Sequence, residues 1–283
     1  PFTPPDQPSL NWSPFTLDTF PPHPGLISAA RWAWEAVHKN PKLLHPYVVT
    51  IGAMGAGKST LAETLVAAAP KTTRYFPEEY QKIKPLSQFY ALLAEYVRSQ
   101  NADILDQLHQ VQAQVQGGFA ALKFTQMLEA PMLLSAQPVL QDVWSLGDTV
   151  YVIAHAQMGI MSQDNLHHYA ADVALRHQLL PPHVKYPIII YPHISFPTLE
   201  TRIRQVRGRD FEASVPPHYL EHLHQVGSQL AQTLEHLGYP VISVDAENHD
   251  FRPENGGLDH ARRLWDQIYQ LHQEKVLPHL GLG

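Results

Sequence analysis

The chain has 283 residues, enough to bury a continuous core, and carries a formal charge of −6 with 44% hydrophobic residues. This mild acidity gives no electrostatic reason to expect a nucleic acid or an anionic membrane as partner. Charged residues make up 16% of the sequence, against roughly 25% in an average soluble domain, so the surface is short of charge. The shortage favours a surface of which much is covered by something else.

The sequence contains no cysteine. This excludes disulfides, thiolate zinc sites, iron–sulfur clusters and cysteine nucleophiles, and we expect no redox cofactor on the chain. No run of about 18 apolar residues occurs, so we expect no transmembrane segment. The chain begins at Pro1 rather than Met, as a processed or truncated product would.

Residues 1–24 are rich in proline and carry the aromatic side chains of Trp12, Phe15 and Phe20. Proline at this density prevents a helix or a sheet ladder. Two interpretations stay open, a disordered tail or an extended arm that lies on a surface through its aromatic residues. A short helix is predicted at 26–37, so we interpret residues 1–45 as a Pro-rich N-terminal arm followed by this helix.

The remaining residues, 46–283, are interpreted as one α/β domain because short β-branched runs alternate with helical patterns. Strands are expected at 47–51, 73–76, 138–141, 187–191 and 241–244. Helices are expected at 58–68, 86–99, 104–135, 145–157, 163–179, 196–204, 216–237 and 258–276. Strands of four or five residues that are separated by helices are typical of a parallel sheet with helices on both faces.

One segment between the first strand and the following helix carries a chemical signature. The run GAMGAGKS, from Gly52 to Ser59, matches G-x-x-x-x-G-K-[ST]. Its backbone N–H groups and the helix N-terminus would hold a phosphate, Lys58 would reach the terminal phosphates, and Ser59 would bind Mg²⁺. The alternative is a glycine-rich turn that binds nothing, but packing gives no reason for this pattern of glycines followed by Lys and Ser. The predicted phosphate-binding residues are Gly52, Gly55, Ala56, Gly57, Lys58, Ser59 and Thr60.

Two charged clusters lie where they can complement a phosphate site. Glu78 and Glu79 follow the second strand, where a carboxylate can take a proton from a hydroxyl that attacks a γ-phosphate. The alternative is that both are solvated loop acids. Four arginines lie between Arg202 and Arg209, and they form either a lid over phosphates or an ordinary charged helix end.

The order of these features resembles the deoxynucleoside kinase family. The similarity covers about residues 47–244 and includes the P-loop, Phe76-Pro77-Glu78, Phe89-Tyr90, a long helix, Asp142 after the third strand, and an Arg-rich lid. It implies a P-loop kinase fold with a five-stranded parallel sheet and a Pro-rich N-terminal extension. It also implies ATP or another (deoxy)nucleotide, with Mg²⁺, as ligand.

Roles for single residues follow from the same resemblance. Glu78 matches the general base and Asp142 the acidic position of the catalytic motif after the third strand. The substrate pocket would contain Tyr90 at the sugar and Gln114 at the base, with Glu212 from the lid. Two lid arginines, Arg207 and Arg209, would hold the phosphates.

The sequence departs from the family at the third strand. Active members carry Asp/Glu-Arg-Ser there, whereas this chain has Asp142-Val143-Trp144. Loss of an arginine that stabilises charge on a transferring phosphoryl group can lower the rate by several orders of magnitude. The usual Glu-Pro after the second strand is Glu78-Glu79. We therefore do not expect an efficient nucleoside kinase, and Glu78 would be a weak or vestigial base.

One branch of the family fits these losses, the deoxynucleoside-kinase-like accessory subunit of mitochondrial respiratory complex I. The similar strings are Phe76-Pro77-Glu78, Leu86-Ser87-Gln88-Phe89-Tyr90, Gly159-Ile160, His168-Tyr169 and Leu180-Pro181-Pro182-His183. This resemblance implies a non-redox subunit of NADH:ubiquinone oxidoreductase on the matrix side of the inner mitochondrial membrane. Its partners would be other subunits of the complex and a nucleotide. The intact P-loop differs from the degraded loops of animal members of this branch.

Two alternatives remain open. The chain would be an active soluble deoxynucleoside kinase if Glu78 serves as base for transfer of the ATP γ-phosphate to a nucleoside 5′-hydroxyl. It would be an unrelated P-loop kinase or ATPase if its ligand is neither a nucleoside nor a nucleotide, because a phosphate-binding loop does not by itself identify the acceptor.

Overall fold

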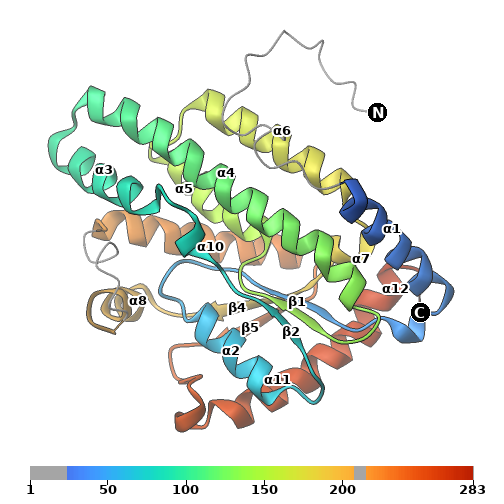
Figure 1. The fold of residues 1–283 in the computed structure, drawn as a ribbon. Coiled ribbons are helices and arrows are strands. Elements are labelled where there is room, and N and C mark those ends of the chain that lie inside the picture. Colours follow the sequence, from blue (N-terminus) through green and yellow to red (C-terminus); the bar gives the residue numbers. More distant parts are fainter. Residues whose placement is uncertain (1–23, 207–214, 283) are drawn as a thin grey trace.

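A computed structural model describes residues 24–206 and 215–282. Its centre is a five-stranded sheet in which every strand pairing is parallel and the order is β2-β3-β1-β4-β5 (Figure 1). The strands are β1 (Tyr47–Thr50), β2 (Arg74–Phe76), β3 (Val139–Gln141), β4 (Ile188–His193) and β5 (Val241–Asp245). The predicted five-stranded parallel α/β fold is confirmed.

The helices follow the predicted segments closely. They are α1 (Pro24–Lys39), α2 (Lys58–Ala68), α3 (Leu86–Ser99), α4 (Ala102–Leu133), α5 (Thr149–Gln157), α6 (Gln163–Leu179), α7 (Pro182–Lys185), α8 (Phe196–Thr201), α10 (Pro217–His236), α11 (Gly257–Leu271) and α12 (Leu277–His279). The helix predicted at 145–157 is divided, because a 3-10 turn, η3 (Ser145–Asp148), precedes α5. Two π-helical turns, η4 (Arg202–Val206) and η6 (His272–Val276), extend α8 and α11.

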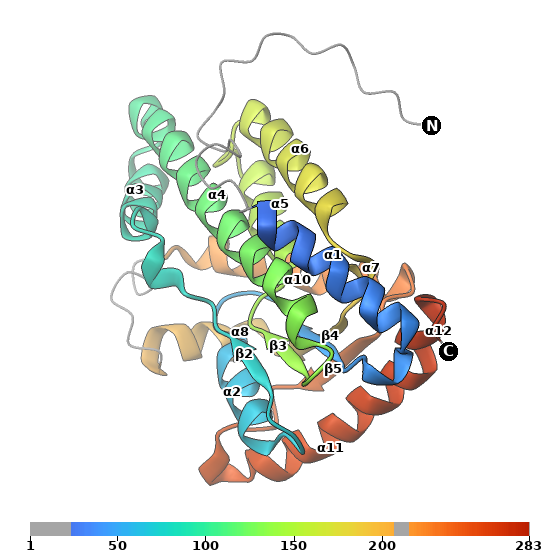
Figure 2. The same cartoon turned by 45° about the vertical axis from the view of Figure 1, so that its right-hand side comes forward.

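Helices cover both faces of the sheet, with α2 and α11 together on one side and α1 and α4 on the other (Figures 1 and 2). On β1, Val48 packs in the same cluster as Leu65 and Trp265, whereas Val49 packs in the same cluster as Val37. Successive strand residues point to opposite faces, so a central strand buried on both sides is apolar throughout. None of the described helices is both long and apolar enough to cross a lipid bilayer.

Two hydrogen bonds tie the C-terminal helices to the rest of the fold. The indole Nε1 of Trp265 on α11 donates to the carbonyl of Leu65 on α2 at 2.8 Å. The ring Nε2 of His272 lies 3.0 Å from the carbonyl oxygen of Leu44, just before β1. Helix α1 also belongs to the core, since Ala30 and Val37 are fully buried. The Pro-rich arm that was predicted before it lies outside the described residues, apart from Pro24 at the start of α1.

The loops that follow β1, β2 and β3 meet at one edge of the sheet. Because parallel strands end at the same edge, the P-loop, the segment beginning at Pro77 and the segment beginning at Asp142 converge there. Backbone hydrogen bonds fix this arrangement, from Asp142 N to the carbonyl of Phe76 at 2.8 Å and from Trp144 N to the carbonyl of Thr50 at 3.0 Å. The candidate site lies at this edge.

Candidate active site

The loop at residues 52–57 has the backbone conformation of a phosphate-binding loop. Gly55 and Gly57 have φ values of 80° and 90°, in the left-handed region that favours glycine. A Cβ on Gly55 would lie 2.6 Å from Cγ1 of Ile203, so this position also lacks room for a side chain. Gly57 is the N-cap of α2, which places the first free N–H groups of that helix at the loop.

Lys58 occupies the centre of the loop. Its side chain is buried, and Nζ donates to the carbonyl of Ala53 at 2.8 Å. Lys58 lines two hollows, a cleft that runs along the P-loop to Arg202 and Asp250, and a separate cavity on the other side. The ammonium group therefore lies where these two spaces meet.

Asp142 is fixed beside the start of α2. Thr50 Oγ1 donates to its Oδ1 at 2.8 Å, and the side chain of Ser59 also forms a hydrogen bond with it. Burial raises the pKa of Asp142, the negative charge of Glu78 raises it further, and Lys58 opposes both effects. This is the position predicted for the acid after the third strand.

The residues at this point fit a magnesium ion. The Ser59 hydroxyl and the Asp142 carboxylate are hard oxygen ligands that lie together at the start of α2. Residues 24–206 and 215–282 hold no group of three or more His, Asp or Glu side chains that could bind a metal. Magnesium needs no such group, because it commonly takes one or two protein ligands and completes its shell with phosphate oxygens and water.

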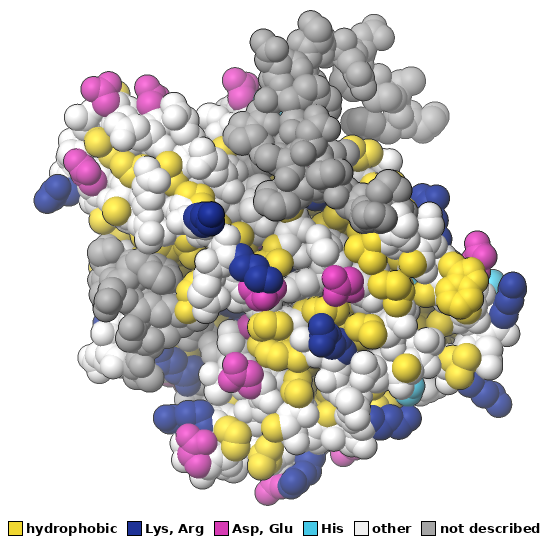
Figure 3. All heavy atoms as spheres, viewed as in Figure 1, with side chains coloured by type: hydrophobic (Ala, Val, Ile, Leu, Met, Phe, Trp, Pro, Cys, Tyr) yellow, Lys and Arg dark blue, Asp and Glu magenta, His cyan; other side chains and the backbone are white. Residues whose placement is uncertain are grey.

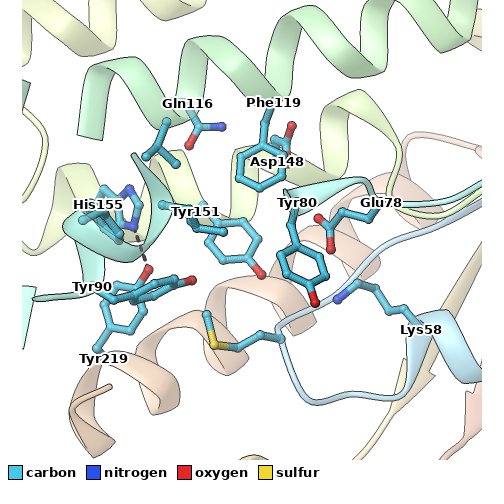
Figure 4. A pocket seen from close by; sticks show the side chains of 14 residues that line it. Lys58, Glu78, Tyr80, Tyr90, Gln116, Phe119, Asp148, Tyr151, His155 and Tyr219 are labelled. Atoms are coloured by element: carbon cyan, nitrogen blue, oxygen red, sulfur yellow. Dashed lines mark hydrogen bonds between the residues drawn. The ribbon is translucent and has the colours of Figure 1, made fainter. Parts of the chain in front are cut away.

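A cavity that is partly open to solvent adjoins the P-loop. Aromatic side chains from α3, α4, α5, α10 and the short 3-10 helix Tyr80–Lys82 form its walls. Polar groups come from Glu78, Lys58, Gln116, Asp148 and His155 (Figure 4). The aromatic lining residues are Phe89, Tyr90, Phe119, Tyr80, Tyr151 and Tyr219. Aromatic walls with a few polar groups suit a flat, polar-edged ligand such as a nucleobase.

Glu78 and Lys123 place opposite charges on one side of this cavity. Lys123, on α4, is 1% exposed, and its Nζ lies 3.7 Å from Oε1 of Glu78. The same ammonium forms a short ion pair with Asp148, from η3, and lies 5.0 Å from the ring centre of Phe119. Burial raises the pKa of Asp148 to about 6, although Lys123 opposes the shift.

His155, which is buried, lines the wall of the cavity opposite Glu78 (Figure 4). The Nδ1 of His155 lies 3.3 Å from the amide nitrogen of Gln112, so it accepts that hydrogen bond, and Nε2 is left to donate to the hydroxyl of Tyr219 at 2.8 Å. Burial lowers the pKa of His155 to about 3, so its ring is neutral near pH 7. The pair orients the phenol of Tyr219 at the cavity.

Of the residues predicted to line the substrate pocket, Tyr90 lies in the cavity and Gln114 does not. Tyr90 lines the cavity as predicted from the resemblance. The placement of Gln114 was wrong, because its side chain is exposed on α4 and the glutamine that lines the cavity is Gln116. Sequence reasoning also missed Lys123, Asp148 and His155. The helical repeat could have indicated Lys123, because residues seven apart, such as Gln116 and Lys123, lie on the same face of α4.

The predicted lid residues Arg207, Arg209 and Glu212 lie outside the described residues. Arg202, from the same cluster, lies beside the P-loop, since its Nη1 would be 3.6 Å from a Cβ on Gly57. Its Nη2 donates to the carbonyl of Ala246 at 2.7 Å, which holds it against the segment after β5.

Val143, where the family motif has arginine, adopts an unusual conformation. Its φ is 65°, and its side chain is 1% exposed. A β-branched residue is rare in this left-handed region and costs about 1–2 kcal/mol there. The N–H of Val143 donates to Thr50 Oγ1 at 3.0 Å, which stabilises the turn. A buried apolar side chain at this position supplies no positive charge to the site.

Comparison with known protein families matches residues 48–268 to the model described as deoxynucleoside kinase. The chain belongs to the deoxynucleoside kinase family. The matched range contains the P-loop, Glu78, Lys123 and Asp142. Among curated protein sequences, none matches the chain.

Solved structures of a deoxynucleoside kinase share the fold. The deoxyadenosine kinase from M. mycoides with bound dATP has a TM-score of 0.59 and 18% identity, covering 80% of this chain and all of the other. The same enzyme with the products dCMP and a flexible dCDP has a TM-score of 0.57 and 18% identity, covering 81% of this chain and all of the other. At this identity the likeness establishes the common fold.

Proposed function

We propose that the chain binds a nucleoside triphosphate with Mg²⁺ on its P-loop and a (deoxy)nucleoside in the adjoining cavity, and that it transfers the γ-phosphate to the nucleoside 5′-hydroxyl. The observation that carries this proposal is that Lys58 lines both the phosphate cleft and the aromatic cavity, with Glu78 beside it (Figure 4). A donor and an acceptor bound in these spaces would meet at these two side chains.

The side chains present can perform the transfer. The carboxylate of Glu78 accepts the proton as the O–H bond of the 5′-hydroxyl breaks and its oxygen bonds to the γ-phosphorus. The bond between that phosphorus and the β–γ bridging oxygen breaks, and the nucleoside diphosphate leaves with the electron pair of this bond. Lys58 and the N-terminus of α2 stabilise the charge on the phosphates. Magnesium bound at Ser59 and Asp142 would supply further charge neutralisation.

Two observations support a deoxynucleoside as the acceptor. The cavity is lined by aromatic rings and by Gln116 and Asp148, which suit a nucleobase with polar edges. The relative from M. mycoides, which shares the fold, is a deoxyadenosine kinase whose structures hold dATP, dCMP and dCDP.

The test is transfer of labelled γ-phosphate from ATP to deoxyadenosine, deoxycytidine, deoxyguanosine and thymidine by the purified chain. Glu78→Gln should lower kcat by about 10²–10⁴-fold, because the amide cannot accept the proton, while ATP affinity stays the same. The matched control is Glu79→Gln. Glu79 is paired with exposed Lys82, and its loss should leave kcat unchanged. No transfer by the unaltered chain, or full activity of Glu78→Gln, contradicts the proposal.

A second candidate is an accessory subunit of mitochondrial respiratory complex I whose kinase site binds nucleotide with reduced turnover. It is favoured by Val143 in place of the arginine, by the local strings around Glu78 and Pro181, and by the 16% charged fraction. Hydrophobic side chains also reach the surface over α1 (Figure 3), where Trp32 is 71% exposed. The proposed location is the matrix side of the inner membrane, with other subunits of the complex as partners.

Native electrophoresis of mitochondrial membranes followed by mass spectrometry tests this candidate. The chain should migrate with the complex I band and remain there after washing with salt, because a largely uncharged contact is little weakened by screening. Detection only as a small species, apart from complex I, contradicts it. The two candidates are separable, since the first is measured on the purified chain and the second on its native assembly.

A further inference from the structure

Three carboxylates surround the proposed reaction centre, and the structure shows two ammonium groups among them. Burial raises the pKa values of Asp142 and Asp148, and the negative charge of Glu78 raises both further. Lys58 opposes the shift at both acids, and Lys123 opposes it at Asp148. A triphosphate on the P-loop adds several negative charges, and Lys58 then pairs with its phosphates. Among residues 24–206 and 215–282, Lys123 is then the positive charge beside both Glu78 and Asp148.

Lys123 lies at a position where an ammonium group is costly. It is 1% exposed and its neighbours along α4 include the buried residues Ala120, Phe124 and Met127. Removing such a group from water costs several kcal/mol unless it is paired. Its pairing with Asp148 and its contact with Phe119 offset this cost. An apolar side chain would fill the same helix position with no desolvation cost to offset.

We propose that Lys123 is the positioning residue for Glu78, and that it supplies from α4 the positive charge that Val143 does not supply from the loop after β3. The inference rests on the proposed kinase function. Lys123 bridges Glu78, at the phosphate end of the cavity, and Asp148, farther along the cavity wall. Its ammonium group holds the Glu78 side chain in place and directs it toward the hydroxyl proton, so one side chain aligns the base with the substrate.

The experiment uses the full chain and compares four variants, Lys123→Met, Lys123→Arg, Val143→Arg and the double variant Lys123→Met with Val143→Arg. Lys123→Met should lower kcat about 10²-fold while KM for ATP stays within about threefold, because the charge acts on the base. Lys123→Arg should retain most activity. In the Val143→Arg background the Lys123→Met loss should shrink at least about tenfold, since either cation can serve Glu78.

A pH profile separates this role from a purely structural one. Several charged or titratable groups lie near Glu78 (Figure 4): Lys58, Lys123, Asp142, Asp148, Tyr75 and Tyr80. Of these, the Lys123→Met variant removes one charge, and the dependence of kcat on pH should change, because the cation beside the base is lost. Lys82→Met is the matched control, because Lys82 is exposed and pairs with Glu79, and its profile should not move.

Each outcome has a distinct meaning. A folded Lys123→Met variant with normal kcat and pH profile overturns the role of Lys123, as does an equal loss with and without Val143→Arg. If Lys123→Met does not fold, Lys123→Gln replaces it, since the amide still donates to Asp148 without a charge. An unaltered chain that transfers no phosphate to any nucleoside overturns the proposed function, and the role of Lys123 with it.

Discussion

Asp148 has one satisfied and one unsatisfied carboxylate oxygen. Its Oδ1 is paired with Lys123, whereas Oδ2 is buried and accepts no hydrogen bond within the described ranges. A buried acceptor without a partner costs about 1–3 kcal/mol. Asp148 also lines the cavity, so a donor brought by a ligand can remove this cost. The exocyclic amino groups of adenine and cytosine are such donors.

Asp148→Asn should therefore change base preference more than overall activity. The amide keeps the shape but loses the charge that strengthens the hydrogen bond, so KM for deoxyadenosine and deoxycytidine should rise about 10-fold or more, and KM for thymidine less. Steady-state kinetics with each nucleoside measure the difference. Asp106→Asn, at an exposed position of α4, is the control. An equal change for all bases would mean that Asp148 makes no base contact.

The phase of α4 explains which site residues were predictable. Residue type alone selected Gln114, but Gln116 and Lys123 are seven residues apart and share one helix face, whereas Gln114 lies on another. The P-loop and Glu78 were predictable because their chemistry is encoded in contiguous residues. The pairing of Lys123 with Glu78 and Asp148 was not, since three separate segments create it.

At the scale of elements, Trp265 joins two helices on the same face of the sheet. The indole is 1% exposed, and its N–H donates to Leu65 on α2. Trp265→Phe should lower the free energy of unfolding by about 1–3 kcal/mol, because it leaves that carbonyl unsatisfied and removes buried atoms. Chemical denaturation measures the change. Trp32→Phe, at a side chain 71% exposed, should change it by less than about 0.5 kcal/mol.

The boundaries of most helices were predictable, but the division at residue 148 was not. The hydrophobic pattern of 145–157 is continuous, whereas the backbone forms η3 before α5 begins. The cause lies in packing, since a Cβ on Gly147 would be 3.1 Å from Cγ1 of Val143 and 3.4 Å from Cγ2 of Ile51. Close approach of this turn to β1 depends on distant residues, and a local pattern does not contain it.

Across the whole molecule, three buried histidines link separate parts of the fold. His155 contacts Tyr219, His183 stacks on Trp34 of α1 with ring centres 5.0 Å apart, and His272 contacts Leu44. Burial lowers the pKa of His155 and His183 to about 3 and that of His272 to about 4, from 6.5. Each ring is neutral in the folded chain near pH 6 and would take up a proton on unfolding.

Acidification should therefore destabilise the protein below pH 6.5. A lowered pKa in the folded state means that stability present above pH 6.5 is lost as pH falls, by about 2 kcal/mol for each histidine at pH 5. Asp148, whose pKa is raised to about 6, acts in the opposite direction and offsets about 1 kcal/mol. Urea unfolding at pH 7 and pH 5 measures the net loss of several kcal/mol.

Single variants assign this loss to particular rings. His272→Gln should reduce the difference between pH 7 and pH 5 by about 2 kcal/mol, because the amide can still donate to Leu44 and does not titrate. His236→Gln, at an exposed position near the end of α10, should leave the difference unchanged. Equal stability at both pH values would contradict the assignment.

The central place of β1 also determines when the sheet can form during synthesis. Its two neighbours are β3 and β4, and Val48 pairs with Leu140 and Ile188, both far later in the sequence. At about 5–20 residues per second, β4 leaves the ribosome on the order of ten seconds after β1. β3 is made earlier and can pair with one edge of β1, but until β4 emerges the other edge has no native partner. An unpaired edge of an apolar strand can associate with other chains, so the nascent chain is a natural client for chaperones.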